Sequence, residues 1–92
     1  MFKFKPGRIV MSRGVNDLVA EDEGFAKFVW DSLKRHAMGD WGDLDEEDKK
    51  ENEFSLDKNL RLLSAYETGP RKIWIITESN REVSTILFPE EY

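Results

Sequence analysis

The chain has 92 residues, with 19 acidic and 14 basic side chains, one histidine and no cysteine. Without cysteine it cannot form disulfides, thiolate zinc sites or iron–sulfur clusters, and it has no cysteine nucleophile. Its length fits one domain spanning residues 1–92. Aromatic residues make up 12%, which argues against a disordered chain. No apolar run reaches the length of a membrane span, so we expect a soluble, cytoplasmic protein.

The first predicted elements are a short strand over residues 8–12 and a long helix over residues 20–38. The helix has acidic residues at its start and basic residues at its end, as the helix dipole favours. A turn is expected between the two elements, near Asn16 and Asp17. One apolar stripe recurs at helical spacing and consists of Phe25, Phe28, Val29, Leu33 and Ala37.

The middle of the chain is strongly acidic and predicts a short surface helix over residues 44–53. Asp43 and Glu46 are three residues apart, as in the capping box that starts a helix. Residues 40–57 hold nine acids and two bases, which gives −7, whereas residues 1–13 hold four bases and no acid, which gives +4. An acidic surface repels nucleic acid and attracts cationic partners, although it is also typical of a helix that only keeps a protein soluble. We therefore expect no direct nucleic-acid binding.

Three further strands are predicted over residues 60–67, 72–77 and 83–88, where β-prone residues are separated by short turns. Short connections favour an antiparallel meander. The predicted fold class is α+β: a small antiparallel sheet of about four strands, comprising the N-terminal strand and this meander. The long helix packs across one face. The acidic helix and the terminal segments, or a second copy of the chain, could cover the other face, and we favour a monomer over a homodimer.

A family resemblance is carried by five strings of residues. They are HAMGDWGDL at 36–44, NE at 52–53, RLLSAY at 61–66, IWIITE at 73–78 and TILFPEEY at 85–92. In this order they resemble a family of short, uncharacterised bacterial proteins that plasmids, phages and integrated elements carry, often described as plasmid-related proteins. The resemblance extends over nearly the whole chain. It implies a mobile-element context and assigns no catalytic residue.

The single histidine, His36, is the first candidate for a site. With Asp40 and Asp43 it could form a divalent-metal or acid–base cluster, because imidazole and carboxylates together hold such ions. The favoured interpretation is structural, because His36 falls in the middle of the apolar stripe. In that interpretation it ends the helix and hydrogen-bonds the Asp40 or Asp43 loop. Ser64 has no nucleophile motif, and only His36 could serve it as an imidazole base.

The second candidate is a binding surface formed by Trp41, Asp43, Glu46 and Glu47. A tryptophan between two glycines, flanked by acids, could be an exposed anchor for a partner. It could also fold back as a plug between the helix and the sheet, which is the interpretation we favour, because a chain this small needs every large apolar group in its core.

Two classes of function stay open. The favoured one is a non-enzymatic accessory protein of a mobile element that binds a macromolecular partner, such as a protein. The alternative is a small metal-assisted hydrolase using His36, Asp40 and Asp43. Three possible ligands on a helix end and a loop do not make a catalytic cleft, which favours the binding protein. On this interpretation the protein needs no cofactor.

Overall fold

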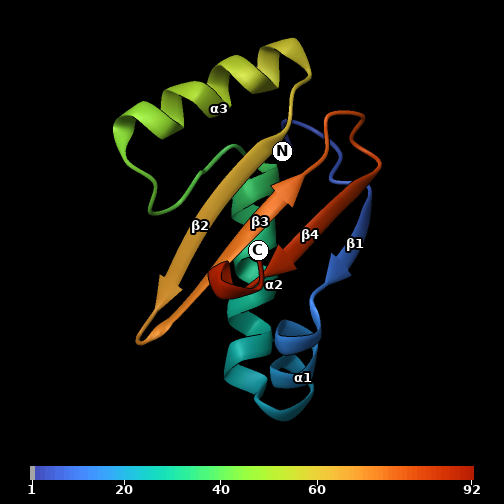
Figure 1. The fold of residues 1–92 in the computed structure, drawn as a ribbon, viewed down its shortest axis with the longest axis vertical. Helices are drawn as coiled ribbons and strands as arrows, with labels where there is room; N and C mark the ends of the chain where they lie inside the picture. The colour runs from blue at the N-terminus through green and yellow to red at the C-terminus, as the bar shows by residue number, and fades with distance from the viewer. Residues whose placement is uncertain (1) are drawn as a thin grey trace.

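The computed structural model describes residues 2–92, which form one mixed sheet with helices on both sides (Figure 1). In Figure 1, α2 crosses behind the sheet with α1 beside it, whereas the C-terminal turn η1 lies in front. The fold is therefore α+β, as predicted. The elements in chain order are β1 (Arg8–Met11), α1 (Arg13–Glu21), α2 (Glu23–Ala37), α3 (Glu46–Lys58), β2 (Leu62–Thr68), β3 (Arg71–Thr77), β4 (Val83–Leu87) and η1 (Pro89–Glu91).

The strands lie in the order β1-β4-β3-β2. The predicted meander is confirmed, because β2 pairs with β3 and β3 with β4 in antiparallel register. The expectation of a wholly antiparallel sheet is wrong at one edge, where β1 runs parallel to β4 with Ile9 opposite Ser84. A parallel neighbour needs a long crossover rather than a hairpin. Here the chain between β1 and β4 includes both helices of the back layer, which supply that crossover.

The predicted helix over residues 20–38 is in fact the end of one helix and the whole of another. They meet at Asp22, whose backbone is extended (φ −132°, ψ 106°). The Asp22 carboxylate accepts a hydrogen bond from the Phe25 amide at 3.0 Å and so caps α2. The Asp22 amide donates to the Leu18 carbonyl at 2.9 Å and ends α1. The turn expected near residues 16–17 is likewise helical, because the Ser12 side chain starts α1 one turn earlier.

The acidic helix is longer than predicted and starts two residues later. Asp45, rather than Asp43, is its N-cap, with a carboxylate that accepts from the Asp48 amide at 2.8 Å. The helix continues to Lys58 and ends at Asn59, which takes the left-handed conformation that stops helices (φ 56°). Asp43 is thereby left outside the helix.

The core lies between the back helices and the sheet. Of the predicted stripe, Phe28 is half-buried and the other four residues are buried. On the opposite face of the sheet, the ring of the C-terminal Tyr92 packs edge-on against Trp74 with centroids 5.6 Å apart. The main core cluster consists of Val15, Phe25, Val29, Leu33, Tyr66, Ile73, Ile75 and Ile86.

Candidate functional site

His36, near the end of α2, faces the sheet and is fully buried. Its Nδ1 atom lies 2.5 Å from the Ser64 hydroxyl on β2, and its Nε2 atom lies 2.8 Å from the Thr77 hydroxyl on β3. The expected contact between the imidazole and the Asp40 or Asp43 loop is therefore wrong. Both ring nitrogens instead bridge two strands beneath the helix.

The hydrogen bonds around His36 form one chain whose donors can be assigned. The Ser84 hydroxyl donates to the Pro6 carbonyl at 2.7 Å, because a carbonyl can only accept. Ser84 then has no proton left for Thr77, so across their 2.6 Å contact the Thr77 hydroxyl donates. His36 must in turn donate from Nε2 to the Thr77 hydroxyl. In a neutral imidazole the proton is therefore on Nε2, and Nδ1 accepts from the Ser64 hydroxyl.

Burial keeps the imidazole neutral. It lowers the pKa of His36 from the ordinary 6.5 to about 3, and the positive charge of Arg81 adds to this effect. Phe4, from the segment before β1, packs edge-on against the imidazole with ring centroids 5.3 Å apart. The N-terminal segment therefore closes the space above the histidine.

The Ser64–His36 contact has the reach of a nucleophile and its base, but its surroundings do not suit catalysis. Both residues are 0% exposed, so no substrate reaches the hydroxyl in the folded protein. A base with a pKa of about 3 is also far too weak to take a proton from serine near neutral pH. The second ring nitrogen faces the hydroxyl of Thr77 instead of a carboxylate that would stabilise an imidazolium. The arrangement serves as a buried polar network.

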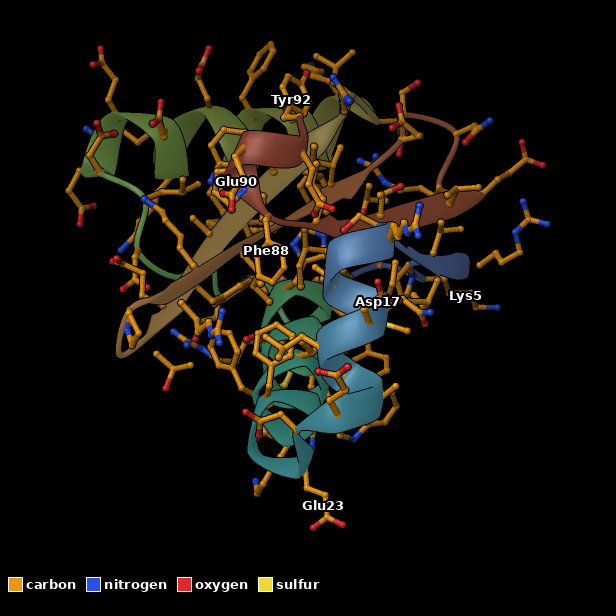
Figure 2. All side chains as sticks on the ribbon, turned by 60° about the horizontal axis from the view of Figure 1, so that its bottom comes forward. Lys5, Asp17, Glu23, Phe88, Glu90 and Tyr92 are labelled. Atoms are coloured by element: carbon orange, nitrogen blue, oxygen red, sulfur yellow. The ribbon has the colours of Figure 1, made fainter. Side chains whose placement is uncertain are left out.

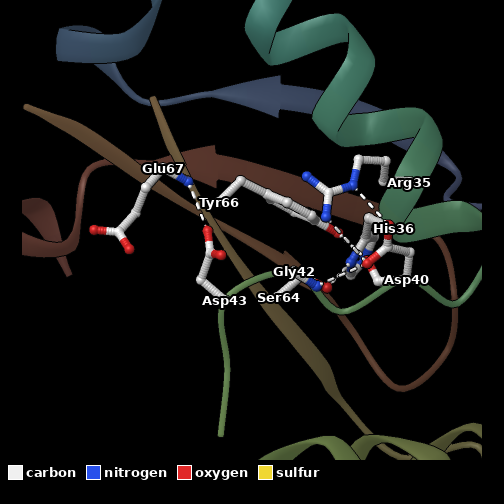
Figure 3. Close-up of polar contacts among 8 residues, drawn as sticks. All are labelled: Arg35, His36, Asp40, Gly42, Asp43, Ser64, Tyr66 and Glu67. Atoms are coloured by element: carbon white, nitrogen blue, oxygen red, sulfur yellow. Dashed lines mark hydrogen bonds and ion pairs between the residues drawn. The ribbon is translucent and has the colours of Figure 1, made fainter. Parts of the chain in front are cut away.

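Asp40, directly after α2, is held by an ion pair rather than by the histidine (Figure 3). Arg35 Nε donates to its carboxylate at 2.7 Å, and this hydrogen bond is the main reason that the pKa of Asp40 is lowered. The Gly42 amide donates to the same carboxylate at 3.1 Å. The Arg35 guanidinium lies 4.9 Å from the centre of the Tyr66 ring, and the Tyr66 hydroxyl donates to the Asp40 carbonyl at 2.6 Å. Asp40 therefore fixes the exit of α2 against β2.

Asp43 makes a separate contact, further along β2. Its carboxylate accepts from the Glu67 amide at 2.9 Å, and its own amide donates to the Ala65 carbonyl at 2.7 Å. The three proposed metal ligands thus face different groups: His36 the hydroxyls, Asp40 the guanidinium and Asp43 the strand backbone. Within residues 2–92, no three histidine or carboxylate side chains gather as a potential metal-binding group.

The outer edge of β2 is closed by hydrogen bonds from outside the sheet. Asn52 of α3 uses both ends of its amide, donating to the Leu63 carbonyl and accepting from the Leu63 amide at 3.2 Å. Gly42 then pairs with Ala65 as an isolated parallel bridge. Together with the Asp43 contact, these bonds occupy successive outward-facing backbone groups of β2. The acidic helix and the loop before it therefore protect this strand from pairing with another chain.

Gly42→Ala is expected to destabilise the protein by about 2 kcal/mol or more, because the bridge leaves no room for a side chain. A Cβ atom at Gly42 would lie 2.0 Å from the Ala65 carbonyl oxygen, and the residue has a positive φ of 75°. Gly69→Ala is the matched control, since its φ is also positive (56°) but nothing lies within 4 Å of the added carbon. Urea unfolding of both variants measures the difference. Equal losses would show that the backbone conformation, rather than the bridge, requires glycine.

Trp41 lies in the interior and has 4% of its surface exposed, as the plug interpretation predicts. Its indole stacks on Phe4 with ring centroids 6.4 Å apart, and it lies edge-on to the His36 ring with centroids 5.8 Å apart. The indole N–H donates to the Glu53 carboxylate of α3 at 2.6 Å. Trp41 thus joins the N-terminal segment, α2 and α3, and it is not available to a partner on the folded surface.

The exposed part of the predicted binding surface lies on α3. Glu46 and Glu47 both face solvent. Sequence reasoning missed Phe54, which is 58% exposed although it is large and apolar. Residues 47, 51 and 54 follow the spacing i, i+4, i+7, so Glu47, Glu51 and Phe54 share one face of the helix. We call these three residues the α3 outer face; helical spacing alone could have revealed it.

Comparison of the chain with protein-family models, with curated proteins and with solved structures finds no match. Among residues 2–92, no helix combines the length and the apolar character that crossing a bilayer demands.

Proposed function

We propose that this chain is a non-enzymatic accessory protein of a mobile genetic element, which binds a cationic protein through the α3 outer face. The observation that carries the proposal is Phe54, a large apolar side chain 58% exposed beside carboxylates. Exposed aromatic residues are favoured as binding anchors. The mobile-element context is supported by the family resemblance of the sequence.

The charge of the α3 outer face supports a cationic partner. Within residues 2–92, neither the Glu47 nor the Glu51 carboxylate has an ion-pair or hydrogen-bond partner, so their charge is not neutralised internally. Such charges accelerate association with a surface of opposite sign. Nucleic acid is disfavoured as the partner because its phosphates carry the same sign. We propose that the protein acts as a cytoplasmic monomer.

Phe54→Ala is expected to weaken partner binding by about 2 kcal/mol, a loss of roughly 30-fold. The double variant Glu47→Lys, Glu51→Lys should weaken it further, and more strongly at low salt, because it replaces attraction with repulsion. Glu23→Lys is the matched control, since Glu23 is exposed at the start of α2. Affinity capture from the host with quantitative mass spectrometry identifies the partner, and titration with the purified partner then measures each affinity.

Capture of the same protein by all four forms at equal strength would contradict the proposal. A partner lost with the two α3 variants and retained by Glu23→Lys would support it. The unfolding free energy of each variant is measured in parallel, so that loss of binding is not confused with loss of the fold.

A further inference from the structure

The two edges of the sheet differ. The β2 edge is covered by α3 and the loop before it, whereas within residues 2–92 no such hydrogen bonds reach the outer side of β1 at the other edge. The Arg8 amide donates to the Glu82 carbonyl at 2.9 Å, and the Ser12 amide donates to the Ile86 carbonyl at 2.8 Å. Backbone groups alternate in direction along a strand. The amides and carbonyls of residues 9 and 11 therefore point away from β4, and within residues 2–92 they have no hydrogen-bond partner, so they can pair with another strand.

An apolar groove runs along the same edge, between β1 and α2. The groove consists of two adjoining hollows, and both are lined by Ile9, Trp30 and Leu33. The Trp30 side chain has 58% of its surface exposed. Lys34 is the one charged side chain among the lining residues that the structure describes. An added strand would place every second side chain over this groove, because the Ile9 side chain lies on the helix side of the sheet.

The N-terminal segment beside the groove is basic, although Arg13 pairs with Asp17 at 4.0 Å and Lys34 of the groove lining pairs with Asp31 at 3.5 Å. Residues 1–13 carry four positive charges and no negative one. Within residues 2–92, no carboxylate lies within 4.0 Å of the charged groups of Lys3, Lys5 or Arg8. Figure 2 shows Lys5 at the outer edge of the molecule, beyond β1. A segment that binds here is therefore favoured when it carries negative charge.

We propose that the β1 edge binds an extended acidic segment of a partner protein as a fifth strand of the sheet. Its backbone pairs with Ile9 and Met11, its apolar side chains enter the groove against Trp30, and its carboxylates lie beside Arg8. A second copy of this chain is disfavoured because it would bring two segments of charge +4 together. Nucleic acid is disfavoured because it has neither amide backbone nor aliphatic side chains. This surface is separate from the α3 outer face and does not depend on its function.

The probe is a short capped peptide in which valine and glutamate alternate, and fluorescence anisotropy measures its binding. Trp30→Ala and Ile9→Pro are each expected to weaken binding by about tenfold. Proline at residue 9 removes the outward amide and leaves the hydrogen bonds to β4 in place. Ile9→Ala is compared with Ile9→Pro, since it shortens the side chain but keeps that amide. Phe54→Ala is the matched control for Trp30→Ala, because both aromatic residues are 58% exposed.

Amide hydrogen exchange of the unmodified protein gives a second readout that needs no variant. The peptide should protect the amides of Ile9 and Met11 from exchange. Protection elsewhere, no binding, or equal binding of an analogue with lysine in place of glutamate would overturn the proposal. So would tighter binding of a single-stranded oligonucleotide, or a dimer in sedimentation that protects the same two amides without any peptide. If Trp30→Ala captures the partner of the α3 outer face as strongly as the parent does, the two surfaces bind independently of each other.

Discussion

Lowering the pH from about 7.5 to about 4.5 is expected to reduce the free energy of unfolding by about 2.7 kcal/mol through His36 alone. Folding lowers the pKa of this imidazole from 6.5 to about 3. The unfolded chain therefore takes up the proton first as the pH falls. The stabilising contribution is complete above pH 6.5, declines below that value and is lost by about pH 3.

The variant His36→Gln separates the pH dependence caused by the imidazole from the pH dependence caused by carboxylates. The pKa of Asp40 is lowered by its ion pair with Arg35, so that contact also loses strength in acid, but it does so in both proteins. Urea unfolding at a series of pH values should give a steep slope between about pH 6.5 and 5 in the parent and a nearly flat one in His36→Gln. The variant is also expected to be less stable than the parent at neutral pH, and the difference between the two proteins should shrink as the pH falls. Parallel slopes in the two proteins would mean that the imidazole is not buried in its neutral form.

Phe25→Ala is expected to lower the free energy of unfolding by about 3–5 kcal/mol, a large part of the stability of so small a domain. The Phe25 ring is 4% exposed and lies where α2 meets the chain after β4. Its centroid is 5.9 Å from those of both Phe28 and Phe88. Removing the ring leaves a cavity among groups that cannot all move inward.

Phe54→Ala is the control, because the same substitution at an exposed site should cost less than about 1 kcal/mol. Thermal and urea unfolding of the two variants give the comparison. If Phe25→Ala melted within a few degrees of the parent, the helix–sheet core would not depend on this ring.

Local periodicity explains what could be predicted of the fold. Val29 and Leu33 were identified as core residues because a helix of 3.6 residues per turn puts them on one face. The break at Asp22 was missed because an acidic residue near a helix start is equally consistent with the dipole and with a cap. The parallel pairing of β1 depends on a contact with β4, more than 70 residues later, for which the sequence has no local signal.

In the candidate site, too, local spacing could be predicted from the sequence, whereas contacts between distant residues could not. Position within the apolar stripe predicted that His36 would be structural, but its partners Ser64 and Thr77 are 28 and 41 residues away. A signal was present in the strand alternation, because Ser64, Thr77 and Ser84 all occupy inward-facing positions of neighbouring strands. Three hydroxyls on the buried side of a sheet require polar partners, and the chain has a single histidine to meet two of them.

The cover over β2 also limits how copies of this protein could aggregate. Fibres grow when each molecule offers two complementary strand edges, so that every addition exposes another site. Here Asn52 and Gly42 occupy the backbone of one edge, and in the sheet that residues 2–92 form, the β1 edge alone remains for pairing. Joining two molecules through their β1 strands would use the last open edge of each. Strand pairing between native copies is thus self-terminating, and a fibre built by strand pairing would require α3 and the loop before it to detach from β2.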